Sequence, residues 1–138
     1  MGKKLLALGL TVAVGLGSLV GCKMNEYEKK IIYYGDEKCT KVIHWSGQYG
    51  NRAYSSFEIC NTNEEYHQFN YFKGDKSILI RDGGYGWKRD GLVDYLSVKI
   101  NKENLTLIRE RDYPKYKKAL DKANEFLAEK REEFKNHY

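Results

Sequence analysis

The sequence predicts an α+β fold in which an antiparallel sheet of about six or seven strands is followed by one C-terminal amphipathic helix. Two observations support this fold class. Between residues 31 and 109, short runs rich in β-branched and aromatic residues alternate with Gly, Asn and Asp, the residues of turns. After residue 112 there is no Gly and a single Pro, and apolar residues recur at helical spacing. A chain of 138 residues has room for one such domain.

The first 22 residues differ in composition from the rest of the chain. Lys3 and Lys4 precede a charge-free run of sixteen residues from Leu5 to Val20. A bilayer span needs about 20 residues, whereas the apolar region of a secretory signal is shorter and follows positive charge. The run ends in the sequence Leu19-Val20-Gly21-Cys22.

This ending resembles the lipobox of bacterial lipoproteins, which has an aliphatic residue, a variable one, a small residue and then Cys. The resemblance implies that Cys22 carries diacylglycerol and that a peptidase removes the signal peptide, residues 1–21. By the family's sorting rule, Lys23 implies the outer membrane in a Gram-negative host. An uncleaved signal anchor and a buried helix are the alternatives, and four Gly residues, Gly9, Gly15, Gly17 and Gly21, disfavour a helix.

Removal of residues 1–21 leaves 22 basic and 19 acidic residues, so the net charge falls from +5 to +3. Such a mild charge on an exported protein argues against nucleic acid as a partner. The expected contacts are the membrane, through the N-terminal lipid, and an envelope protein or wall polymer. We therefore expect an extracytoplasmic protein anchored to a membrane by lipid.

Cys39 and Cys60 form an even pair once the lipobox accounts for Cys22. They flank two predicted strands, 40–45 and 53–59, which a loop containing two Gly residues separates. A hairpin centred between residues 49 and 50 places Cys39 opposite Cys60 and Lys41 opposite Glu58, a favourable cross-strand pair. The sequence therefore predicts a disulfide. The rival hypothesis is a metal site made of both cysteines, His44 and His67, but metal ligands usually come in tight pairs.

The mature chain divides into three predicted parts. Cys22 and a polar tether occupy residues 22–30, a β-rich domain occupies 31–111, and a helix occupies 112–138. Turn residues separate the candidate strands, which are Ile31–Tyr34, Thr40–Trp45, Ala53–Ile59, Tyr66–Phe72, Ser77–Arg81, Val93–Ile100 and Leu105–Arg109.

The C-terminal helix is predicted to begin at Asp112, as its cap, with Pro114 in its first turn. Its apolar stripe predicts packing on the sheet, and a coiled-coil partner is the alternative. The stripe is interrupted at Lys130, and no apolar residue lies between Ala128 and Phe134. This pattern predicts that the end of the helix projects into solvent.

A Gly-rich stretch, residues 81–96, carries the candidate functional residues. Tyr85 and Trp87 lie among three Gly residues, where aromatic rings form a possible contact surface for a sugar ring or a protein. Asp90 and Asp94 resemble the second half of calcium loops of the D-x-D-x-D-G-x-x-D kind, although Lys88 stands where those loops carry an acidic residue. The alternative is a turn in which both Asp side chains accept backbone N–H groups.

No nucleophile motif, metalloprotease motif or phosphate-binding loop is present in the sequence. We therefore expect a non-enzymatic binding or structural module of the cell envelope that needs no cofactor and has no catalytic residues. One alternative is an inhibitor or exclusion factor that acts on a wall hydrolase or a phage. Another is a small envelope hydrolase.

Overall fold

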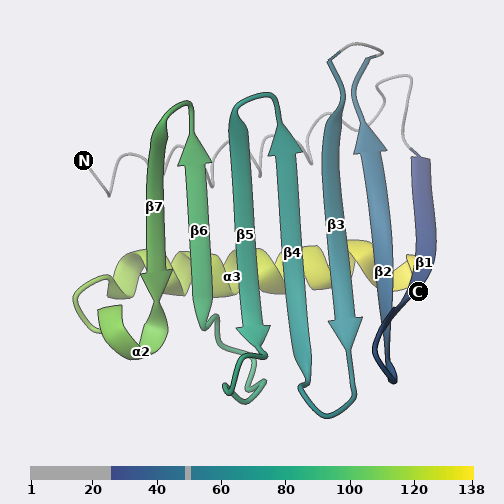
Figure 1. The fold of residues 1–138 in the computed structure, drawn as a ribbon. Helices are drawn as coiled ribbons and strands as arrows, with labels where there is room; N and C mark the ends of the chain where they lie inside the picture. Colours follow the sequence, from purple (N-terminus) through teal and green to yellow (C-terminus); the bar gives the residue numbers. More distant parts are fainter. Residues whose placement is uncertain (1–25, 49–50) are drawn as a thin grey trace.

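Seven antiparallel strands lie side by side in chain order, and one long helix crosses a single face of the sheet (Figure 1). The computed structural model describes residues 26–48 and 51–138. The strands are β1 (Glu26–Tyr34), β2 (Glu37–Ser46), β3 (Ala53–Cys60), β4 (Tyr66–Lys73), β5 (Lys76–Gly83), β6 (Tyr95–Ile100) and β7 (Glu103–Ile108). This architecture confirms the predicted α+β fold class.

The helical part of the chain begins earlier and is more divided than the sequence predicts. A short helix α2 (Arg109–Asp112) follows β7, and the long helix α3 (Lys117–Phe134) leads into the 3-10 turn η1 (Lys135–His137). Asp112 does not cap α3, because its carboxylate accepts the backbone N–H of Ile108 at 2.8 Å and so supports the start of α2. No helix within residues 26–48 and 51–138 is long and apolar enough to cross a membrane.

The hydrophobic core lies between α3 and the sheet face that the helix covers. The helix contributes Leu120, Ala123, Phe126, Leu127 and Phe134, each at most 4% exposed. Alternate residues of the strands meet them, because side chains on a strand point to opposite faces in turn. The sheet's largest contributions to this core are Val42, Phe57, Phe69, Tyr71, Ile78, Ile80, Leu96, Val98 and Leu107.

The predicted projection of the helix end is wrong. Phe134 is fully buried, and its ring lies 6.0 Å from that of Phe57 and 6.3 Å from that of Phe69. Lys130, which interrupts the apolar stripe, is 6% exposed. Its ammonium group bonds to Glu133 at 2.8 Å and lies 5.4 Å from the centre of the Phe126 ring. A lysine can therefore sit on the core face when its stem covers apolar surface and its charge is paired.

The predicted hairpin register between β2 and β3 is confirmed. Cys39 pairs with Cys60 and Trp45 pairs with Tyr54 in the ladder. The two cysteines form a disulfide, with their Cα atoms 4.4 Å apart. His44 lies on the opposite face of β2, so the cysteines and this histidine do not converge on a common metal site. Disulfides persist in oxidising compartments, and this bond is consistent with an extracytoplasmic protein.

The predicted tether, residues 22–30, is too long, because residues 26–30 belong to β1. Glu26 pairs with Trp45 and Lys30 pairs with Lys41 along the whole of β2. Charged residues fill this segment because β1 is an edge strand, and charged side chains there are typical protection against further strand pairing. Composition alone therefore makes an edge strand look like a linker. The predicted lipidation site, Cys22, lies outside the described residues.

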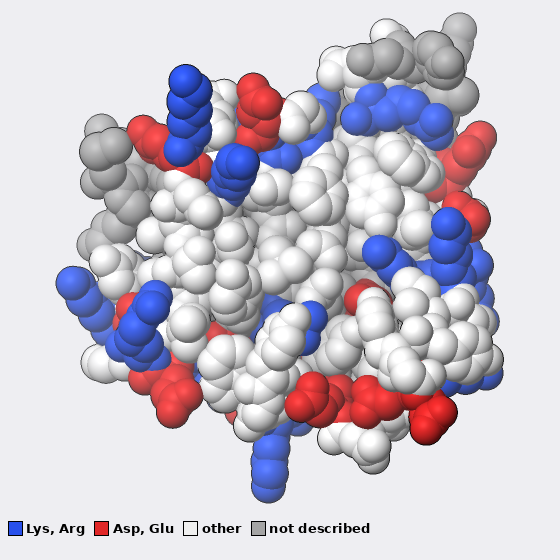
Figure 2. Space-filling view, in the orientation of Figure 1, with Lys and Arg blue, Asp and Glu red and all other residues white. Residues whose placement is uncertain are grey.

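The second face of the sheet carries no helix, and Figure 2 shows it directly, with an uncharged middle. Near one end of the strands, the rings of Trp45, Tyr54 and Phe72 follow one another on the adjacent strands β2, β3 and β4. Small polar side chains, among them Ser56 and Asn70, lie in the next row of the ladder. The face is therefore partly apolar although no element of the described chain covers it.

Candidate ligand-binding site

The predicted contact residues Tyr85 and Trp87 lie on a tight turn at the end of β5. Gly84 and Trp87 form an isolated bridge, and the Trp87 N–H donates to the Gly84 carbonyl at 3.0 Å. Tyr85, at the tip, has a φ of 51°, a left-handed conformation that is uncommon for a residue with a side chain. Tyr85 is 72% exposed. The turn thus holds a large aromatic side chain in solvent and at some cost in backbone strain.

The guanidinium of Arg81 fixes the Tyr85 ring from one side. It lies 4.3 Å from the centre of the Tyr85 ring and 4.3 Å from that of Tyr66, so the cation is stacked between two aromatic rings. The Nε atom of Arg81 donates to the side-chain oxygen of Gln68 at 2.8 Å. Gly84 has a φ of 75°, a conformation that residues with a side chain rarely adopt, and a Cβ there would also lie 2.6 Å from the Arg81 Nη1 atom, so glycine suits this position.

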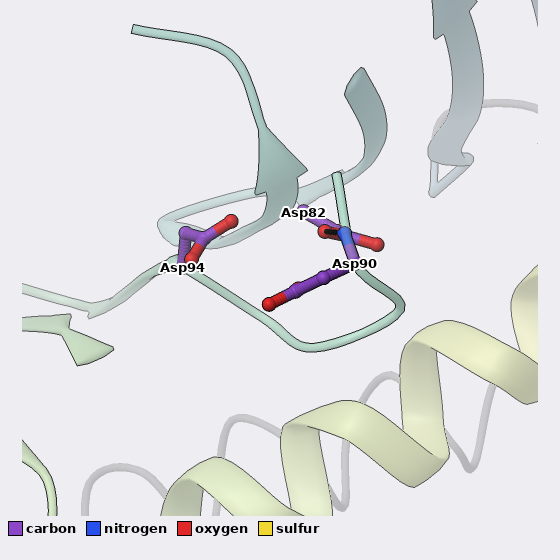
Figure 3. A group of neighbouring side chains, drawn as sticks. All are labelled: Asp82, Asp90 and Asp94. Atoms are coloured by element: carbon purple, nitrogen blue, oxygen red, sulfur yellow. Dashed lines mark hydrogen bonds between the residues drawn. The ribbon is translucent and has the colours of Figure 1, made fainter. Parts of the chain in front are cut away.

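Three carboxylates hold the rest of the loop, which runs from β5 to β6. Oxygens of Asp82, Asp90 and Asp94 all lie within 4.8 Å of one another (Figure 3). Asp82 accepts the backbone N–H groups of Asp90 at 3.1 Å and of Gly91 at 2.9 Å. Asp94 accepts the N–H of Gly83 at 2.7 Å. The carboxylates therefore pin the two ends of the loop together. Asp90 and Asp94 each accept a backbone N–H group, from Leu92 and Gly83, as the turn hypothesis predicted.

Arg109 of α2 supplies positive charge to this acidic cluster. Its Nη2 atom lies 2.8 Å from an oxygen of Asp90 and 3.0 Å from an oxygen of Asp94. Burial raises the pKa of Asp94, and Arg109 opposes this effect. At Asp90, which is more exposed, burial also acts to raise the pKa, but the bonds to Arg109 and to the Leu92 N–H together lower it. A calcium ion bound by Asp90 and Asp94 would have to displace this arginine, so the donor set favours the turn over the calcium loop.

A hollow of about 600 Å³ lies between the turn and α2. It is lined by Tyr85, Gly86, Trp87, Asp94, Arg109 and Glu110. Its volume falls within the range of small-ligand sites, about 300–1,000 Å³. The indole N–H of Trp87 donates to Glu110 at 3.1 Å, so the ring is oriented by a residue of another element.

The structure thus brings together the two predicted aromatic residues and adds α2, which the sequence did not identify. Residues 105–109 read as a strand, and nothing in their spacing indicates that Arg109 and Glu110 return to the 83–94 loop. The sequence does not single out Asp82, because this residue follows a predicted strand and precedes two Gly residues, as an ordinary turn residue does. The three carboxylates gather only because antiparallel pairing places the end of β5 beside the start of β6.

The histidines do not contribute to this hollow. His44 and His137 stack on the two sides of the Tyr27 ring, at 4.1 and 3.6 Å between ring centres. His67 is packed beneath α3, where its Nδ1 atom accepts the Nε–H of Arg131 at 2.9 Å. Burial lowers the pKa of His67 to about 4, and the positive charge of Arg131 adds to this effect.

Comparisons with known proteins found no matching family model, no similar curated protein and no similar solved structure.

Proposed function

We propose that the protein is a lipid-anchored lipoprotein of the cell envelope and that it is a non-enzymatic binding module. The lipobox-like sequence before Cys22 supports the anchor, and the Cys39–Cys60 disulfide supports an oxidising compartment. In this proposal the hollow beside Tyr85 and Trp87 holds the ligand.

The observation that carries the proposal is the arrangement of this hollow. Tyr85 is exposed in a strained conformation, and such strain persists where the surrounding structure imposes it, often at functional sites. Trp87 offers a second oriented ring beside the charged groups of Arg109 and Glu110. Aromatic rings stack on the apolar faces of sugars, while charged groups bond their hydroxyls. A sugar of a wall polymer is therefore the ligand that this lining favours.

The same geometry makes a hydrolase the weaker alternative. Hydrolysis of a glycosidic bond needs one carboxyl group that donates a proton and another that remains ionised. Here Asp94 is bound to Gly83 and Arg109, and Asp90 is bound to Arg109 and to the N–H of Leu92. Both groups are engaged in holding the loop.

The binding test is a titration of tryptophan fluorescence with soluble cell-wall muropeptides in the Trp45→Phe variant, in which Trp87 is the single remaining tryptophan. Tyr85→Gly removes the ring and also relieves the left-handed strain, so the variant should fold while binding falls at least ten-fold. Tyr113→Ala is the matched control, because Tyr113 is an exposed aromatic residue, 43% exposed, outside the hollow. Unchanged affinity in Tyr85→Gly would refute the site. Turnover of the fragments would point to the hydrolase, and co-purification of one stoichiometric protein would point to the inhibitor.

The anchor is tested separately by metabolic labelling with a fatty acid. Cys22→Ser should abolish the label and leave the precursor unprocessed or in the soluble fraction. Normal labelling in this variant would refute the lipoprotein proposal. Fractionation of a Gram-negative host would then test the outer-membrane location that Lys23 implies.

A further inference from the structure

β1 is the first described strand, so the place where it begins indicates which end of the sheet is close to Cys22. Only residues 23–25 separate Cys22 from Glu26, the first residue of β1. Four residue steps span at most about 14 Å. The edge at which β1 begins, uppermost in Figure 1, also holds the β2–β3, β4–β5 and β6–β7 hairpins. We call this end of the sheet, which strand ends and hairpins form, the anchor edge.

The anchor edge carries an aromatic hollow of about 420 Å³, which Trp45, Arg52, Tyr54, Phe72, Lys73 and Gly74 line. The ring centres of Trp45 and Tyr54 are 5.0 Å apart, and the Arg52 guanidinium lies 5.1 Å from the Trp45 ring. Phe72 is 50% exposed. Trp and Tyr are enriched at the interface between membrane and water, where a ring can meet lipid while its polar end remains hydrated.

The charge of the anchor edge is complementary to anionic lipid. Its basic side chains are Arg52, Lys73, Lys76, Lys99 and Lys102, and its acidic side chains are Glu26, Asp75 and Glu103. Arg52 faces Glu26 at 3.8 Å, whereas none of the four lysines forms an ion pair with another described residue. The connections at the opposite edge, residues 35–36, 61–65, 84–94 and 109–112, contain seven acidic and four basic residues. The two edges therefore differ in the sign of their charge.

We infer that the anchor edge rests on the anionic surface of the bilayer in which the Cys22 lipid is inserted. This inference rests on the proposed lipidation, and it adds an orientation. The lipid and the anchor edge bind the same surface, so the strands stand upright on the membrane. An eight-residue strand spans about 26 Å, and the hollow of Tyr85 and Trp87 lies at the opposite end of the strands. The ligand site thus points away from the membrane, toward the wall.

The two tryptophans of the chain allow this orientation to be measured, because Trp45 lies at the anchor edge and Trp87 lies at the opposite edge. Residues 22–138 contain every described strand and helix. With Cys39 and Cys60 joined, the remaining thiol, that of Cys22, can be coupled to a maleimide lipid in vesicles that contain brominated phosphatidylcholine. Bromine quenches tryptophan fluorescence only at short range.

In the Trp87→Phe variant, the remaining Trp45 should be quenched, and addition of phosphatidylglycerol should increase the quenching. In the Trp45→Phe variant, the remaining Trp87 should be unaffected. Without the coupled lipid, Lys73→Ala should lower partition onto phosphatidylglycerol vesicles about five-fold, the effect of one lysine near an anionic surface. Lys88→Ala is the control, because it removes the same charge from the opposite edge and should change nothing.

Equal quenching of the two tryptophans would overturn the orientation. Quenching of Trp45 that is independent of phosphatidylglycerol, or equal effects of Lys73→Ala and Lys88→Ala, would overturn the role of anionic lipid. The chemical coupling supplies an anchor whether or not cells lipidate Cys22. Failure of labelling in cells would therefore refute the proposed lipoprotein, whereas failure of selective quenching would refute the orientation alone.

Discussion

Replacement of Phe134 by Ala tests whether the end of α3 is docked on the sheet. The ring is fully buried and lies 5.9 Å from the ring of Tyr27, 6.0 Å from that of Phe57 and 6.3 Å from those of His44 and Phe69. Its truncation would remove the contact between the last turn of the helix and four strands. It would also leave a cavity in a region where the backbone on one side is a sheet that cannot collapse into it.

We expect Phe134→Ala to lower the free energy of unfolding by about 3–5 kcal/mol, the usual loss when a buried aromatic ring is truncated. For a domain slightly above 100 residues, each kcal/mol shifts the melting temperature by about 4 °C. The loss should therefore appear as a shift of about 12–20 °C in a thermal unfolding curve followed by circular dichroism, and as a lower midpoint in urea.

Two variants bracket this measurement. Leu127→Ala, in the middle of the helix, should cost about 2–5 kcal/mol whether or not the helix end is docked. Tyr113→Ala removes an exposed ring from the same C-terminal segment and should change stability by less than about 0.5 kcal/mol. If Phe134→Ala behaves like Tyr113→Ala while Leu127→Ala destabilises, the end of the helix projects into solvent and the packing described here is refuted.

Three further predictions concern the disulfide, the buried histidine and the arginine of the loop. Replacement of both Cys39 and Cys60 by Ser should lower the free energy of unfolding by about 3 kcal/mol, because the disulfide closes a loop with a sequence separation of 21. If a reducing agent leaves the urea midpoint of the wild type unchanged, the disulfide does not stabilise the domain. His67 binds its proton less tightly in the folded state, where its pKa is about 4, than in the unfolded state, where it is about 6.5. The stability that His67 contributes is thus fully present above pH 6.5 and is lost as the pH falls toward 4. The free energy of unfolding should fall by up to about 3 kcal/mol over this window, and His67→Gln should flatten its pH profile there. Arg109→Met leaves the buried carboxylate of Asp94 without its cation, so it should raise the pKa of Asp94 further. The variant should lose about 1–3 kcal/mol of stability at neutral pH. The loss should be smaller under acid conditions, where the carboxyl group is protonated and needs no cation.

The candidate site shows where prediction from the sequence ends. Tyr85 and Trp87 were identifiable because a Gly-rich stretch with two aromatic residues is locally unusual. Arg109 and Glu110 were not, because they lie more than twenty residues further along the chain and carry no motif. Their place beside the loop depends on how β7 ends and α2 turns back. That turn depends on the hydrogen bond that the Ile108 N–H donates to the Asp112 carboxylate, a contact that spacing alone does not reveal.

The sequence by itself determined the antiparallel sheet and the register of β2 on β3, whereas the order of all seven strands came from the structure. Alternation of apolar and polar residues within a strand and turn residues between strands are local signals, and the pairing of Cys39 with Cys60 agreed with them. Tertiary structure decided where the sheet begins and where the helix stops packing. The charged residues of β1 and the charged Lys130 are typical of solvent-exposed segments. In the structure, however, β1 forms a ladder with β2, and Lys130 lies against aromatic rings and forms an ion pair with Glu133. Burial depends on what the rest of the chain places against a residue, so it is settled only when the sheet and the helix meet.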